Sequence, residues 1–135
     1  MFYNTTGSAA IDAELAWLRK TDRYIIYFYN NAELHFEDKS KEIIIFRLFQ
    51  EVINNIIQHA QATEIVITLE QVDNAYNIII RDNGVGFKVE EIVNNKKGLG
   101  LQNIKKRTAI IRGHASIVSE PQHGTVITIN IPFKD

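Results

Sequence analysis

The chain has 135 residues, enough for one compact domain with a buried core. Hydrophobic residues make up 45% of it, charged residues 23%, and the formal net charge is −1, so the overall charge gives no reason to expect binding to nucleic acid or an anionic membrane. The lack of cysteine excludes disulfides, thiol nucleophiles and cysteine-bound zinc, and no stretch reaches the roughly 18–20 apolar residues that span a bilayer.

The first half of the sequence predicts a helix, a β-hairpin and a long helix. Residues 8–20 place apolar side chains at helical spacing. The aromatic and β-branched residues at 24–29 predict a strand, and the alternation at 33–37 predicts a second strand, so we expect the two to form a hairpin. Residues 40–60 carry the strongest helical pattern, with Ser40 as the expected N-cap.

The second half adds strands, one long loop and a third helix. Four strands are predicted, at 64–70, 76–81, 115–119 and 125–131. Residues 82–98 are rich in glycine and asparagine and predict a loop, and a loop of this length in a compact domain is typical of a functional lid, which we place at about 87–98. Residues 99–112 predict a helix that stops at Gly113.

This order of elements predicts the fold class. Helices that alternate with pairs of strands favour an α+β fold, a two-layer α/β sandwich. We expect a mixed, mostly antiparallel sheet that is covered by helices on one face.

The long helix carries polar side chains that its core packing does not need. Glu51, Asn55 and Gln58 follow one another at helical spacing on the face opposite the apolar side chains. The spacing alone allows either a solvated face or a face turned toward a ligand. Asn54 and Asn55 are weak helix formers, which hints that an amide oxygen is needed there.

The sequence RDNGVGF at 81–87 follows a predicted strand. Asn-Gly is a common hairpin turn, which is one interpretation of this segment. In the other, Gly84 and Gly86 let the backbone approach a ligand closely, while Asp82 accepts a hydrogen bond from an exocyclic amine.

The sequence GLGL at 98–101 stands at the start of a predicted helix. Free N–H groups and the helix dipole favour phosphate oxygens at such a position, and Lys96 and Lys97 add positive charge. A structural turn would explain the two glycines equally well. The Walker and Rossmann glycine motifs are absent, which excludes those two nucleotide-binding folds.

Together and in this order, the motifs resemble those of the ATPase domain shared by histidine kinases, DNA gyrase, heat-shock 90 chaperones and MutL-type repair proteins (the GHKL or Bergerat fold). QEVINNIIQHAQA at 50–62 is similar to the N box, RDNGVGF and KGLGLQNIKKR at 97–107 to the two glycine boxes, and HGTVITINIP at 123–132 to the closing strand. The strongest resemblance is to the nitrate-sensor and desaturase-sensor histidine kinases, over roughly residues 24–133.

The resemblance implies roles for individual residues. Asn55 would coordinate Mg²⁺ together with the ATP phosphates, and Glu51 would serve as a base or orient water, so these two are the candidate catalytic residues. Asp82 would bind the adenine amine with support from Thr125. The implied ATP-binding set is Asn55, Gln58, His59, Asp82, Gly84, Gly86, Lys97, Gly98, Leu99, Gly100, Leu101 and Thr125.

The resemblance also implies an organisation and an activity. Residues 23–135 would form the ATP-binding catalytic domain, and 1–22 a connecting helix from a dimerisation and phosphoacceptor hairpin that this chain lacks. The domain would transfer the γ-phosphoryl group of Mg-ATP to a histidine on that hairpin, in the cytoplasm. The parent protein would be a homodimer with a response regulator as its downstream partner. It could be an integral membrane receptor. We expect no nucleic-acid partner and no membrane contact of this chain itself.

One departure from the family pattern keeps alternatives open. Family members commonly carry Lys or Arg where this chain has Gln58, a position that faces the phosphates. A nucleotide-sensing or scaffolding module that binds ATP without phosphotransfer is therefore one alternative. An anti-sigma-factor serine kinase, which uses the same fold, is another. None of the four histidines has the helical setting of a phosphoacceptor.

Overall fold

The computed structural model describes residues 7–89 and 96–133, apart from the side chains of 7–9 and 96–99. Its elements in chain order are α1 (Gly7–Arg19), β1 (Ile25–Asn30), α2 (Lys39–His59), β2 (Glu64–Val72), β3 (Ala75–Asp82), α3 (Lys96–Ile110), β4 (His114–Ser119) and β5 (Thr125–Pro132). No helix among the described residues is long and apolar enough to cross a membrane.

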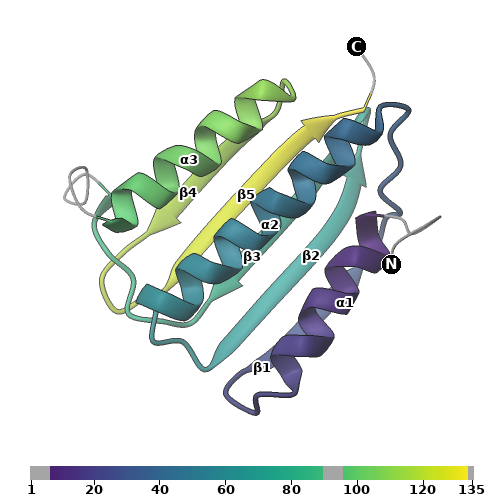
Figure 1. Cartoon of the computed structure of the whole chain (residues 1–135). Coiled ribbons are helices and arrows are strands. Elements are labelled where there is room, and N and C mark those ends of the chain that lie inside the picture. The colour runs from purple at the N-terminus through teal and green to yellow at the C-terminus, as the bar shows by residue number, and fades with distance from the viewer. Residues whose placement is uncertain (1–6, 90–95, 134–135) are drawn as a thin grey trace.

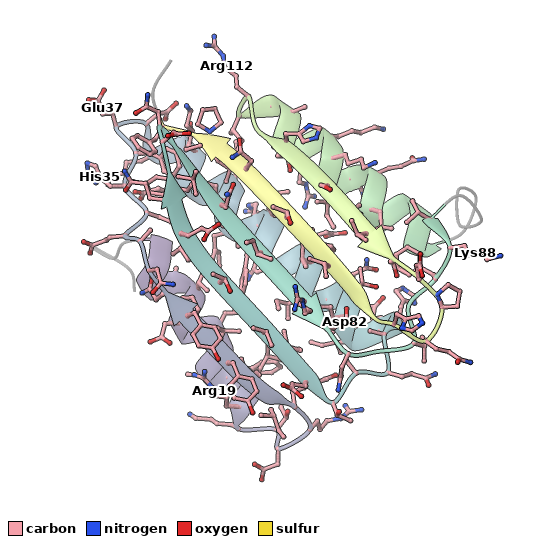
Figure 2. All side chains as sticks on the ribbon, turned by 180° about the vertical axis from the view of Figure 1, so that it is seen from behind. Arg19, His35, Glu37, Asp82, Lys88 and Arg112 are labelled. Carbon is pink, nitrogen blue, oxygen red and sulfur yellow. The ribbon has the colours of Figure 1, made fainter. Side chains whose placement is uncertain are left out.

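The strands form one five-stranded sheet in the order β1-β2-β3-β5-β4. β1 runs parallel to β2, and every other neighbouring pair is antiparallel. Within the described ranges, the three helices lie against the same face of the sheet (Figure 1), and the view from behind shows no helix of these ranges over the opposite face (Figure 2). The predicted α+β sandwich, with a mixed and mostly antiparallel sheet, is therefore confirmed.

The predicted hairpin of residues 24–29 with 33–37 is wrong. β1 pairs with β2, and residues 33–37 form no strand. The side chains of Leu34 and Phe36 are nonetheless buried, and the backbone N–H of His35 donates to the hydroxyl of Tyr76 at 3.3 Å. The alternating pattern therefore marks two side chains that enter the core from an irregular segment. The parallel pair requires a long crossover, which α2 supplies.

The cap of α2 also differs from the prediction. Asp38 is the N-cap, and Ser40 lies inside the first turn. One carboxylate oxygen of Asp38 accepts from the Ser40 hydroxyl at 2.6 Å and from the Ser40 backbone N–H at 2.9 Å. These hydrogen bonds lower the pKa of Asp38, with the side-chain bond as the larger cause. Ser40 is not the cap because it lies inside the helix, which begins at Lys39.

Helix α3 begins at Lys96, three residues earlier than predicted, so Gly98 and Gly100 lie within its first turns. At its C-terminal end the left-handed conformation is taken by Arg112, with φ 59°, rather than by Gly113. Gly113 instead passes close to β5, because a Cβ placed on it would lie 2.6 Å from the carbonyl oxygen of Asn130. The glycine is thus required by packing.

Helix α1 contributes to the same core as the sheet. Ile11, Leu15 and Leu18 are fully or almost fully buried, and the guanidinium of Arg19 donates to the carbonyl of Ile26 at 3.2 Å. The helix thus packs its apolar face into the domain and covers a backbone acceptor of the edge strand β1.

Candidate functional site

A pocket lies where the C-terminal part of α2 meets the ends of β3 and β5. It is lined by Asn55, Ile56, His59, Ala60, Asp82, Gly86, Phe87, Thr125 and Ile127. Five of these residues were singled out from the sequence motifs: Asn55, His59, Asp82, Gly86 and Thr125. Three motifs that are distant in the chain therefore meet at one cavity with an apolar wall and a few polar groups, as is typical of ligand sites.

Asp82 is the last residue of β3 and is only 4% exposed. Figure 2 shows it toward one end of the sheet, with Arg112 projecting from the other. Asp82 lies opposite Ile65 of β2 on one side and opposite Thr125 of β5 on the other. Its carboxylate accepts from the backbone N–H of Gly84 at 2.8 Å, which fixes the side chain beside the pocket.

The two glycines after Asp82 allow close backbone packing. A Cβ on Gly84 would overlap the carbonyl of Ala60 at the end of α2, and Val85 donates its N–H to that carbonyl at 2.8 Å. Gly86 has φ 63°, and a Cβ there would overlap the carbonyl of Glu120. The segment is therefore not a two-residue hairpin turn. It fits between α2 and the β4–β5 turn and holds Gly86 at the pocket wall.

Ser119, at the end of β4, was not singled out from the sequence. Its hydroxyl oxygen accepts from the N–H of Phe87 at 3.0 Å, donates to the carbonyl of Gly124 at 3.1 Å, and lies 2.8 Å from the hydroxyl of Thr125. Its only sequence signal is its position at a strand end before a turn. The hydroxyl joins the glycine-rich segment, the β4–β5 turn and the pocket residue Thr125.

Two polar residues of α2, Glu51 and Asn55, lie on the side of the helix that faces α3. Asn55 and Glu51 face Gly100, in the second turn of α3, since a Cβ on Gly100 would lie 3.5 Å from Asn55 Oδ1 and 3.7 Å from Glu51 Oε1. Glu51 also pairs with Arg107 of α3, another residue that sequence reasoning missed. These two positions therefore lie between two helices and not on a fully solvated face.

Gln58 is exposed and does not line the pocket. Its side-chain amide donates to Asn54 Oδ1 one turn earlier, at 3.4 Å. Leu101 is buried in the core and anchors α3. The side chains of Lys97 and Leu99, and the lid residues 90–95, lie outside the described residues, and Gly98 is placed by its backbone alone, within α3.

Metal ligands do not cluster on their own in the part of the chain that the structure describes. Within 7–89 and 96–133 there is no group of three or more His, Asp or Glu side chains that could hold a metal ion.

Comparison with known families and proteins agrees with the geometry. The family model of histidine kinase-, DNA gyrase B-, and HSP90-like ATPases matches residues 40–135. The signal transduction histidine-protein kinase/phosphatase DegS of Brevibacillus brevis is 37% identical over 93 residues, which cover 68% of this chain and 23% of DegS. The sensor protein VraS of Staphylococcus aureus is 35% identical over 95 residues, 70% of this chain and 27% of VraS. The chain thus spans about a quarter of the length of these relatives.

Solved structures share the fold. The Acinetobacter baumannii histidine kinase AdeS superposes with a TM-score of 0.78 at 18% identity, covering 95% of this chain and 65% of the AdeS chain. The mycobacterial sensor histidine kinase MprB gives a TM-score of 0.69 at 21% identity, covering 94% of both chains. These matches extend beyond the segment covered by the family model, and they establish the fold.

Proposed function

Because this chain belongs to the family of histidine kinase-, DNA gyrase B- and HSP90-like ATPases, which bind ATP, we propose that it is the catalytic domain of a two-component sensor histidine kinase. It would transfer the γ-phosphoryl group of Mg-ATP to a histidine on a dimerisation helix. The observation that carries the proposal is the convergence of Asn55, Asp82 and Thr125 on one pocket. The names of the relatives, all sensor-type or signalling histidine kinases, support the choice among the functions of this family.

The adenine end of ATP would lie at Asp82 and Thr125. Both side chains are buried, at 4% and 8% exposure, and both line the pocket. Their oxygens can accept hydrogen bonds from the exocyclic amine of adenine, while Ile56 and Ile127 supply apolar contact to the base.

The phosphates would extend from the pocket toward the start of α3. The backbone N–H groups of its first turn and the positive end of its dipole favour phosphate oxygens. Asn55 lines the pocket and faces Gly100 near the start of α3, where its amide oxygen could bind a Mg²⁺ ion whose remaining ligands come from phosphates and water. Glu51, one turn earlier on the same side, is the candidate base or water-orienting group.

Catalysis in such a domain would rest on positioning and charge stabilisation, without a covalent intermediate on the enzyme. In-line transfer brings the γ-phosphoryl group and the accepting histidine together from two separate structural units. We therefore propose a dimerisation and phosphoacceptor hairpin of the parent homodimer as the direct partner, and a response regulator as the downstream partner. Residues 1–22 would connect to that hairpin, with α1 docked on the catalytic domain of 23–135. The use of ATP agrees with a cytoplasmic location.

Calorimetric titration with ATP, with and without Mg²⁺, tests the binding step. We expect magnesium-dependent binding by the unaltered chain and strongly weakened binding by Asp82→Asn. A phosphoacceptor hairpin added in trans should then acquire phosphate that is stable in base and labile in acid, as expected for phosphohistidine. The absence of any ATP binding at millimolar nucleotide would contradict the proposal as a whole.

A second candidate function is supported by the surroundings of Gln58. In place of the usual cation, the chain has a neutral side chain that donates a hydrogen bond to Asn54 on the same helix and does not line the pocket. A domain that binds ATP as a sensor or scaffold, without transferring phosphate, would fit this arrangement. Normal ATP affinity together with no transfer to any hairpin would favour this function, and acid-stable phosphate on a partner would indicate a serine kinase.

A further inference from the structure

The hydroxyl group of Ser119 has one hydrogen and three close neighbours. The N–H of Phe87 lies 3.0 Å away and can only donate. The carbonyl of Gly124 lies 3.1 Å away and can only accept. The hydroxyl of Thr125, at 2.8 Å, could do either. The distances alone therefore leave open which of the two hydroxyl groups donates to the other.

Hydrogen-bond accounting resolves this choice. A serine hydroxyl donates once and accepts up to twice. If all three contacts are hydrogen bonds, Ser119 must give its only hydrogen to Gly124, because a carbonyl cannot donate. Ser119 then accepts from Phe87 and from Thr125. The hydroxyl hydrogen of Thr125 is thus turned toward Ser119, and what Thr125 presents to the pocket is its lone pairs.

Thr125 and Asp82 stand side by side at the polar end of the pocket. They are directly opposed in the antiparallel pair β3–β5 and their side chains share the helix-covered face. The carboxylate of Asp82 is an acceptor, and with its hydrogen committed to Ser119, Thr125 is an acceptor as well. The pocket therefore offers two neighbouring acceptors and no hydroxyl donor at this point.

We propose that Ser119 is a positioning residue that sets the base specificity of the pocket through Thr125. Two adjacent acceptors match the two N–H groups of a 6-amino purine and oppose the carbonyl oxygen of a 6-oxo purine such as hypoxanthine or guanine. Without Ser119, the Thr125 hydroxyl can rotate and donate to a 6-oxo group. This inference rests on the proposed function, because it assumes that the base of a purine nucleotide occupies the pocket.

The experiment compares the dissociation constants of ATP and inosine triphosphate for the whole chain. We expect the unaltered chain to bind ATP much more tightly than inosine triphosphate. Ser119→Ala should reduce the ratio of the dissociation constant of inosine triphosphate to that of ATP by about tenfold, mainly because inosine triphosphate binds more tightly. Ser119→Thr keeps the hydroxyl and should keep the ratio. An unchanged ratio in a folded Ser119→Ala variant would overturn the inference, whereas a chain that binds neither nucleotide would contradict the proposed function instead.

A second set of variants separates this role from general destabilisation of the fold. Thr125→Val removes the hydroxyl that Ser119 orients, and it leaves the Phe87 and Gly124 contacts of Ser119 in place. Its ratio should also fall. If Ser119 acts through Thr125, the double variant should show the same ratio as Thr125→Val alone. A ratio in the double variant that is lower than in Thr125→Val alone would overturn the inference. If Ser119→Ala does not fold, Thr125→Val decides alone, and an unchanged ratio in that variant would overturn the inference.

Discussion

The guanidinium of Arg107 on α3 lies 3.6 Å from the carboxylate of Glu51 on α2, measured from Nη1 to Oε2. This ion pair joins the two helices on the side where Glu51 and Asn55 face Gly100. The side chains are 42% and 29% exposed, so water and salt screen the attraction between them. We therefore expect the pair to matter more for the direction of the Glu51 carboxylate than for the stability of the fold.

Arg107→Gln should lower the free energy of unfolding by less than about 1 kcal/mol, because exposed ion pairs contribute little. It should lower phosphotransfer to a hairpin more than it lowers ATP affinity, since Glu51 would lose its orientation. Urea denaturation and a single-turnover transfer assay measure the two effects. Lys106→Gln, which removes an exposed neighbouring charge, is the control. Equal transfer rates in both variants would show that the ion pair has no part in the reaction.

Asp82→Asn should weaken ATP binding by about ten- to a hundredfold. A hydrogen bond to a buried charged group contributes roughly 1.5–3 kcal/mol, and an amide can present a donor to the adenine amine in place of an acceptor. Calorimetry gives the affinity, and Arg81→Gln on the exposed side of the same strand is the matched control. Affinity that stays within twofold of the unaltered chain would remove Asp82 from the base site.

Asn55→Ala should preserve the helix, because alanine is the better helix former, and should abolish the effect of Mg²⁺ on ATP affinity. The adjacent Asn54→Ala is the control, since Asn54 is exposed and does not line the pocket. Titrations with and without Mg²⁺ measure the difference. A magnesium effect of full size in the Asn55 variant would exclude this amide as a ligand.

Gln58→Lys should tighten ATP binding, because it restores a positive charge one turn beyond Asn55 on α2. The gain should shrink as ionic strength rises, since the interaction of an exposed charge is screened. Gln58→Met, of similar length and without charge, should show no salt-dependent gain. Weaker binding by the lysine variant would indicate that the amide of Gln58 makes a contact that the nucleotide requires.

Leu15→Ala should lower the free energy of unfolding by about 2–5 kcal/mol, because the side chain is fully buried and its removal leaves a cavity. Trp17→Ala on the same helix should cost about 0.5 kcal/mol or less, because Trp17 is 62% exposed. Chemical denaturation of both variants tests whether α1 is part of the folded unit. Similar small changes in the two would mean that α1 is only a peripheral connector.

The sequence predicts an element well when the pattern of apolar residues within that element is enough to identify it. The apolar side chains of α2 recur at helical spacing, so its span is found within one or two residues. The segment 33–37 misleads because burial of Leu34 and Phe36 produces the same alternation as a strand. The partner of β1 is β2, on the far side of α2, and no local pattern encodes such a distant pairing.

The candidate site divides in the same way. Asp82, Asn55 and Thr125 belong to recognisable motifs, and the pocket brings them together. Ser119 and Arg107 could not be found from the sequence, because their contacts arise only when distant segments meet. The bond from Phe87 to Ser119, for example, spans 32 positions in the chain. A lone serine or arginine carries no spacing signal of that kind.

The pairing of Asp82 with Ile65 on one side and Thr125 on the other has a consequence for the evolution of this chain. Side chains alternate between the two faces of a sheet, so a slip of one residue in β3 or β5 would move the affected oxygen from the pocket to the helix-free face. A point substitution in these strands keeps the pairing register, so the fold can tolerate it. A single-residue insertion or deletion shifts the register and moves the side chains that follow it to the other face. Among homologous chains, the number of residues in β3 and β5 on either side of Asp82 and Thr125 should therefore vary far less than the amino acids at these positions.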